Sequence, residues 1–287
     1  MAIKHVLVCV DGGSGDSAAL GYSLQIARQL PIHIDVLHVR LDLSKPPKRG
    51  GWYTREVDRL FGIAEVLERG ANEAAARAKQ GFEDWRLENH VPLVDQPSAV
   101  HSISAAWREI KGYEVEVIAS IGRLTDLIIV AQPESGSSPS LALETAVFDT
   151  RRPVLMVPCS LPTDLFFHPI IAWNGSTEAA RAVTCAVPLL ARVQGQVDVF
   201  TAVEAKHDTN PEELLRYMHW HGAPGKEIAI NDTSHSIAEN LFAHAKLERA
   251  GLIVMGAYTH GHYRQFMFGG VTQHAMQHAD IPVLMVH

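Results

Sequence analysis

The sequence predicts an α/β protein built from two similar domains in tandem, each a doubly wound parallel sheet. Apolar runs alternate with helical segments, as in parallel sheets that are covered on both faces. The closing run at Ile281–Val286 repeats an earlier one at Arg152–Pro158. The opening runs at Val6–Gly12 and Ile170–Gly175 also match, and an alanine-rich helical segment follows each. The chain is therefore interpreted as an internal duplication.

The first half opens with a β-α-β unit, because apolar residues between its first two strands, from Ala19 to Ala27, fall near helical spacing. A segment rich in Ala, Glu and Arg at Trp52–Arg86 predicts one long helix with a solvated charged face. Five strands are expected, at Val6–Val10, Ile34–Val39, Ser102–Trp107, Leu127–Ala131 and Val154–Val157.

The second half repeats this order with a shorter connection after its second strand. Its strands are expected at Ile170–Trp173, Val197–Ala202, Glu227–Ile230, Leu252–Met255 and Val283–Val286. The extra length of the first half lies in Leu41–Arg86. The segment Pro158–Phe167 has two prolines and no periodicity, which is typical of a linker. We place the boundary near Thr163, giving domains 1–163 and 164–287.

Composition restricts the classes of protein and ligand. A chain of 287 residues can form two cores, and its formal charge of -7 argues against nucleic-acid or anionic-membrane partners. No apolar run reaches membrane-spanning length, and the N-terminus begins with a strand pattern instead of a signal peptide, so we expect a cytoplasmic protein. The isolated Cys9, Cys159 and Cys185 are expected to be buried thiols rather than a redox or zinc framework.

In a doubly wound sheet the ligand binds beyond the carboxyl ends of the strands where strand order reverses. In the second half the loops concerned are Asn174–Thr177 and Gly256–Thr272. Gly269 and Gly270, at a helix start, would let backbone N–H groups approach an anion. Thr272 could add a hydroxyl, and three side chains between the glycines could add positive charge: His260, His262 and Arg264. The alternative is that the glycines only make a tight turn.

The segments Val254–Ala257 and Phe268–Thr272, with the matching strand starts and the final Pro-Val-Leu-Met-Val strands, resemble the tandem members of the universal stress protein family. The resemblance covers almost the whole chain. It implies an adenine-nucleotide alpha hydrolase-like fold, packed as an internal pseudo-dimer through the final strands. It also implies ATP, with magnesium, as the ligand.

In nucleotide-binding members of that family the loop is Gly-x2-Gly-x9-Gly-Ser/Thr. Gly256 and Gly269 match this pattern, but Thr259 and Gly270 stand where a glycine and a hydroxyl residue are expected. Asn174 replaces the acidic residue near the adenosine, and asparagine can still hydrogen-bond an adenosine edge. The candidate binding residues are Ala172, Trp173, Asn174, Val203, Gly256, Thr259, His260, Gly261, Gly269, Gly270, Val271 and Thr272.

The first half has the acidic residue, Asp11, but its fourth-strand loop at Gln132–Ser140 lacks the glycine cradle and contains Glu134, which would repel phosphate. This half is interpreted as a degenerate copy. Its Gly12–Ser17 segment loosely resembles the phosphate loop of ATP pyrophosphatases, although a turn with Ser14 or Asp16 capping the next helix is the favoured interpretation.

The chain has 16 histidines, and His274 and His278 lie one helical turn apart, so zinc binding is a hypothesis, with solvated surface histidines the favoured alternative. The predicted function is stress-response regulation through nucleotide binding by the C-terminal domain, with little or no hydrolysis and no catalytic residue assigned. The alternative is a nucleotide-free scaffold protein in which both sites have decayed. The sequence does not identify a protein partner, and a homodimer of the chain is one possible assembly.

Overall fold

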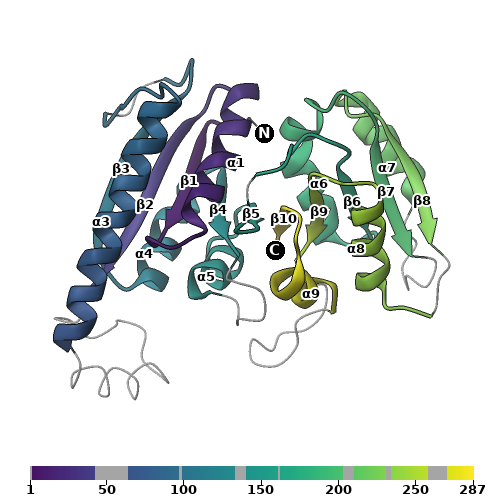
Figure 1. Cartoon of the computed structure of the whole chain (residues 1–287). Coiled ribbons are helices and arrows are strands. Elements are labelled where there is room, and N and C mark those ends of the chain that lie inside the picture. Colours follow the sequence, from purple (N-terminus) through teal and green to yellow (C-terminus); the bar gives the residue numbers. More distant parts are fainter. Residues whose placement is uncertain are drawn as a thin grey trace.

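The computed structural model describes residues 2–42, 64–96, 99–132, 140–160, 162–202, 210–230, 234–257 and 270–287 (Figure 1). Helices and strands alternate along both halves. The elements of the first half are β1 (His5–Val10), α1 (Asp16–Gln29), β2 (His33–Leu41), α3 (Ala64–Glu88), β3 (Ser104–Gly112), α4 (Glu114–Ile121), η2 (Gly122–Leu124), β4 (Leu127–Ala131), α5 (Leu141–Asp149) and β5 (Val154–Val157). Those of the second half are β6 (Ile170–Trp173), α6 (Thr177–Leu190), β7 (Val197–Ala202), α7 (Pro211–Trp220), β8 (Gly225–Ile230), α8 (Ile237–Leu247), β9 (Ile253–Gly256), α9 (Gly270–His278) and β10 (Val283–Val286).

The ten strands form one sheet in the order β3-β2-β1-β4-β5-β10-β9-β6-β7-β8. Strands are parallel within each half, and the halves join where β5 pairs with β10 in antiparallel register, with Leu155 opposite Leu284. The predicted α/β fold with two doubly wound halves is confirmed, and so is the predicted pairing of the final strands. This pairing removes an exposed edge from each half.

The strand positions agree with the sequence-based prediction except at one edge of the sheet. β3 runs on to Gly112 although its apolar pattern ends at Trp107. As an edge strand it has only partly buried and exposed positions after Ala106, and the polar residues Arg108, Glu109 and Lys111 belong to it. An edge strand tolerates such residues because one side of it faces water.

Helices cover both faces of the sheet, and each face has its own apolar core. One core lies between the sheet and helices α1, α3, α6 and α7, and includes Val8, Leu155 and Leu284. The other, which includes Leu7 and Met156, lies against α4, α5, α8 and α9. Successive strand residues point to opposite faces, so both cores run through the seam between β5 and β10. The two halves therefore share their cores.

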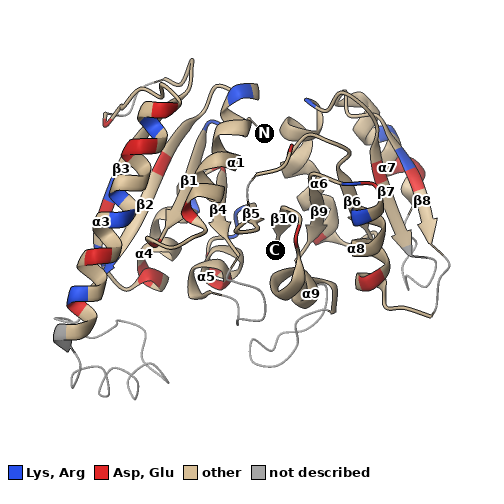
Figure 2. Ribbon diagram, in the orientation of Figure 1, with Lys and Arg blue, Asp and Glu red and all other residues tan. Residues whose placement is uncertain are grey.

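The long helix α3 is confirmed over its described part, while the predicted start at Trp52 lies outside the described residues. Acidic and basic residues recur along the length of this helix (Figure 2). Its inner side carries Phe82, which is fully buried, with its ring centroid 5.6 Å from that of Trp107 on β3. Aromatic packing thus fixes the helix on the edge of the sheet.

The segment between β5 and β6 is held against α1. The backbone N–H of Thr163 donates to the Tyr22 hydroxyl at 3.1 Å, and that of Leu165 donates to the Gln25 side chain at 2.9 Å. Leu165 itself is fully buried. This segment, predicted as a linker from its prolines, is therefore packed on the first half.

Of the three cysteines, Cys9 is buried, and burial raises the pKa of its thiol. Cys159 and Cys185 are partly exposed, so the expectation of three buried thiols is wrong for these two. Cys185 lies on α6, next to Thr184 on the exposed side of the helix. No helix within the described ranges is long and apolar enough to cross a membrane.

Candidate functional site

β6 and β9, the strands that lead into the two loops singled out in the sequence, lie side by side where the strand order of the second half reverses. β6 lies between β9 and β7, and Ala172 is paired with Met255. The next residues along these two parallel strands, Trp173 and Gly256, are therefore neighbours at the carboxyl ends. A crevice at this position is where open α/β sheets bind ligands.

The turn after β6 is shaped by its own side chains. The Asn174 side-chain oxygen accepts a hydrogen bond from the Ser176 backbone N–H at 3.1 Å, and Gly175 has a φ of 73°, which favours glycine. Ser176 then caps α6 by accepting from the Ala179 N–H at 3.1 Å. Trp173 and Asn174 remain partly exposed at the strand end.

Gly256 is required by the close approach of α6. A Cβ atom at this position would lie 2.6 Å from the Ala179 backbone nitrogen. In the first half, the strand registers place Ala131 at the equivalent position, and the glycine is instead Gly15 on the facing loop, whose added Cβ would lie 2.4 Å from Ala131 Cβ. Both halves need one glycine at this contact, but only the second has it on the strand.

Helix α9 supplies the described remainder of the proposed phosphate loop. Among the described residues, a Cβ atom on Gly270 would meet nothing within 4 Å. Val271 is partly buried and Thr272 is only 3% exposed, so its side chain lies mainly inside the fold. Five of the candidate binding residues lie outside the described residues: Val203, Thr259, His260, Gly261 and Gly269.

In the first half, a carboxylate binds the backbone N–H groups of the loop after β1, which is equivalent to the Asn174 turn after β6. Asp16 accepts hydrogen bonds from the backbone N–H groups of Asp11 at 3.0 Å and Gly12 at 2.8 Å. Burial raises the pKa of Asp16 to about 6, although these two bonds act in the opposite direction. The expectation that Ser14 or Asp16 caps α1 is wrong, because Gly15 is at the N-cap and makes no side-chain cap.

Helix α3 also closes this first-half loop. Gly12 has a φ of 84°, and a Cβ atom there would lie 2.4 Å from the Ala74 carbonyl oxygen. The Arg77 Nε donates to the Gly12 carbonyl at 3.0 Å. The described part of the loop that follows β1 is thus bound by the chain itself.

His274 and His278, the pair considered for zinc, lie side by side on α9 with ring centroids 5.0 Å apart. Burial, and then the neighbouring His278, lower the pKa of His274. Within the described ranges, no group of three His, Cys, Asp or Glu side chains is placed to hold a metal ion. A structural argument for zinc is therefore lacking in that part of the chain.

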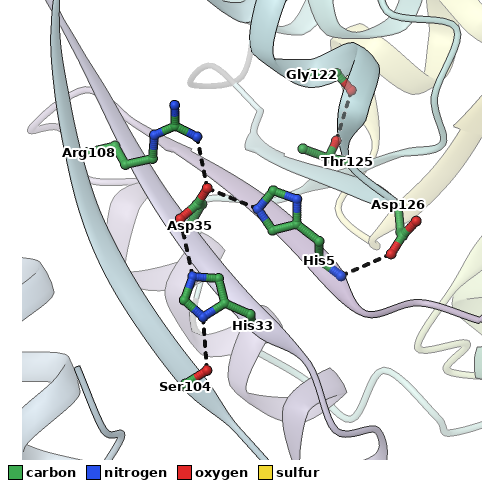
Figure 3. Close-up of polar contacts among 8 residues, drawn as sticks. All are labelled: His5, His33, Asp35, Ser104, Arg108, Gly122, Thr125 and Asp126. Carbon is green, nitrogen blue, oxygen red and sulfur yellow. Dashed lines mark hydrogen bonds and ion pairs between the residues drawn. The ribbon is translucent and has the colours of Figure 1, made fainter. Parts of the chain in front are cut away.

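A polar cluster at the opposite, amino ends of the strands was not predicted from the sequence. Asp35 on β2 lies 2.9 Å from His5 Nε2, 3.3 Å from His33 Nε2 and 2.9 Å from a terminal nitrogen of Arg108 (Figure 3). Burial opposes ionisation of Asp35, but the hydrogen bonds from His33, His5 and Arg108 outweigh it and hold its pKa far below the usual range. The hydrogen bond to Asp35 in turn raises the pKa of His5.

The second half has a matching cluster around Asp198 on β7. His168 Nε2 lies 3.0 Å and His244 Nε2 3.2 Å from its carboxylate, with Lys226 Nζ at 3.5 Å. Asp198 is 1% exposed. A sequence signal does exist, because aligning the halves puts His168 opposite His5, but alternation of apolar residues does not reveal which polar side chains meet.

Together, the fold and the loops define a class: a tandem α/β protein in which each half has a reversal of strand order, the position at which open α/β sheets bind ligands. Residues 168–287 match the sequence profile of the universal stress protein family. This C-terminal half is a universal stress protein domain.

Solved structures show that the likeness in fold extends over the whole chain. A universal stress protein from Archaeoglobus fulgidus DSM 4304 is 17% identical, with a TM-score of 0.62 over 98% of this chain and 97% of that chain. A functionally unknown protein from Pseudomonas aeruginosa PAO1 is 13% identical, with a TM-score of 0.60 over 99% of this chain and 92% of that chain. No curated protein sequence matched the chain.

Proposed function

We propose that the protein binds an adenine nucleotide, ATP with magnesium, in its C-terminal domain and acts in stress-linked regulation with little or no hydrolysis. The observation that carries this proposal is the meeting of Trp173, Asn174 and Gly256 at the strand-order reversal. The candidate phosphate helix α9 follows in the chain, and no described atom lies within 4 Å of a Cβ placed on Gly270 at its start. Free N–H groups and the helix dipole at such a start favour an anion.

Asn174 would face the adenosine. Its side-chain oxygen is engaged by Ser176, which orients the amide and leaves its NH₂ group as a donor for a base or ribose acceptor. Gly256 lets the start of α6 pack closely against the end of β9, beside the proposed site. The proposed set of binding residues is the one predicted from the sequence, including those outside the described ranges.

We propose one nucleotide site per chain, within domains divided near Thr163. The first-half loop supports this, since Asp16 occupies the backbone N–H groups of Asp11 and Gly12, the equivalents of Asn174 and Gly175 in the loop proposed to face the adenosine. Arg77 and Ala74 hold the same loop from α3. A degenerate first site is the consequence.

The test is calorimetric titration of nucleotide-stripped protein with ATP and magnesium, using Gly270→Glu as the key variant. Because a Cβ at Gly270 meets no atom of the described residues within 4 Å, the variant should fold, but its negative charge should abolish ATP binding. Gly195→Glu, also in open space but on the loop before β7, is the matched control and should bind one ATP per chain like the wild type.

Unchanged affinity in Gly270→Glu would sink the phosphate site at α9. No binding by the wild type would favour the nucleotide-free scaffold instead. Product analysis distinguishes the remaining alternatives, because a pyrophosphatase would release AMP and pyrophosphate, an ATPase would release ADP and phosphate, and a binding protein would release neither.

A further inference from the structure

A side chain from the first half supports the helix proposed to bind phosphate in the second. Gln132 stands directly after β4 and is 6% exposed. Its amide Nε2 donates to the Met276 carbonyl at 3.2 Å and approaches the Ala275 carbonyl at 3.5 Å. These carbonyls belong to the last turn of α9, where helix geometry leaves acceptors without a full set of partners.

Gln132 is itself well fixed. Its backbone N–H donates to the Val157 carbonyl at 2.7 Å, and its carbonyl accepts from the Cys159 thiol at 2.8 Å. The amide therefore extends from a rigid strand end, across the seam between the halves, to the end of α9 opposite Gly270. A donor at this end also complements the negative end of the helix dipole.

The equivalent position in the second half cannot return this contact. Ala257 is equivalent to Gln132, since its N–H donates to the Val286 carbonyl at 2.8 Å in the same register. An alanine side chain has no donor for α5, the counterpart of α9. The carbonyl groups at the end of α5 instead accept hydrogen bonds from the first half itself. Thr150 Oγ1 donates to the Ala146 carbonyl, and Arg123 Nε donates to the Asp149 carbonyl.

We propose that Gln132 is a positioning residue for the nucleotide site. It fixes α9 from the C-terminal end so that the N–H groups at Gly270 keep their direction toward the phosphates. The proposal rests on the proposed function, and it assigns the degenerate first half a specific task in ligand binding. A nine-residue helix has few intrahelical bonds, so an external support at one end affects the whole of it.

The first measurement is hydrogen exchange of the α9 amides without nucleotide, in the wild type and in Gln132→Leu and Gln132→Glu. Both variants lose the amide donor. Gln132→Leu places an uncharged side chain of similar size at this buried position, so it serves as the test if Gln132→Glu does not fold. We expect α9 to exchange about tenfold faster, in keeping with the loss of one buried hydrogen bond, and α5 to be unchanged. Gln80→Leu, on the outer side of α3, is the control and should change neither helix.

The second measurement compares the affinities of Mg-ATP and adenosine. Gln132→Leu should weaken Mg-ATP about fivefold to tenfold, as expected for a misaligned set of phosphate donors, and leave adenosine within about twofold. Equal loss for both ligands would indicate a general structural defect and overturn the positioning role, and so would unchanged exchange of α9. If the wild type binds no ATP, the proposed function fails, and the exchange result alone decides whether Gln132 supports α9.

Discussion

Asp35 and Asp198 occupy the same position in the two halves of the sheet. Asp35 on β2 is paired with Leu7, and Asp198 on β7 is paired with Ile170, while a histidine precedes each partner by two residues. Each carboxylate binds two imidazoles and one cation. The second imidazole differs in origin, because His33 comes from the same strand but His244 from α8. The two clusters therefore contain the same kinds of side chain, although not all of these residues occupy equivalent positions in the two halves.

Replacing His5 by glutamine should destabilise the protein in a pH-dependent way. Asp35 raises the pKa of His5, so protonated His5 stabilises the folded state. This stabilisation is fully present below the unfolded pKa of about 6.5 and is lost as pH rises through the higher folded value. We expect His5→Gln to cost roughly 1 kcal/mol at pH 5.5, a value reduced by partial exposure, and less at pH 8.5.

Denaturant midpoints at the two pH values measure this difference. His101→Gln, which changes an exposed histidine, is the control and should leave the pH dependence of wild-type stability unchanged. An equal cost of His5→Gln at both pH values would contradict the linkage.

Replacing Asp198 by asparagine should have a larger effect that does not require a pH change. The carboxylate is 1% exposed and is the shared partner of His168, His244 and Lys226. Removing the negative charge leaves the partly buried His168 and His244 and the half-exposed Lys226 without their charged acceptor, at a cost of about 3 kcal/mol. Urea unfolding checks it, with the exposed Asp164→Asn as control; a loss below about 0.5 kcal/mol, typical of surface substitutions, would show that the cluster is solvated.

Alanine should change the stability of the protein in opposite directions at two glycines, Gly12, which contacts α3, and Gly81, which lies within it. Gly12→Ala should destabilise by about 1–3 kcal/mol, because its φ is 84° and the new Cβ would clash with the Ala74 carbonyl. Gly81→Ala, inside the helix with open space around it, should stabilise by about 0.5–1 kcal/mol. Thermal unfolding of both variants measures the signs. A neutral Gly12→Ala would mean that α3 does not press on the first-strand loop.

The seam between the halves should be as sensitive as a domain interior. Leu155 and Leu284 face each other across β5 and β10, and both are fully buried. Leu284→Ala and Leu155→Ala should each cost about 2–5 kcal/mol by creating a cavity. Because the residues are neighbours, the double variant should deviate from additivity by about 0.5 kcal/mol or more in a double-mutant cycle. Two independent unfolding transitions, only one of them affected by each variant, would show instead that the halves do not share a core.

Thr272 was predicted to contact phosphate from its place in the sequence, but burial limits its access to a ligand. Its place after Gly269 and Gly270 suggested a phosphate donor, but packing of α9 leaves it 3% exposed. The N-cap predicted at Ser14 or Asp16 was wrong because another contact close in the sequence competed with capping of the helix. Asp16 binds the loop that precedes it instead of the helix that it begins.

The sequence by itself determined the α/β class, the duplication, nearly all strand positions and the pairing of the final strands, because alternating apolar runs and repeated motifs report which residues must be buried. Only the tertiary structure decided which polar groups meet. The Asp35 and Asp198 clusters, the contact of Arg77 with the first-half loop, and the contact of Gln132 with α9 join residues far apart in the chain. Their pairing depends on strand register and helix placement, and hydrophobic periodicity specifies neither which acceptor a donor reaches nor at what distance.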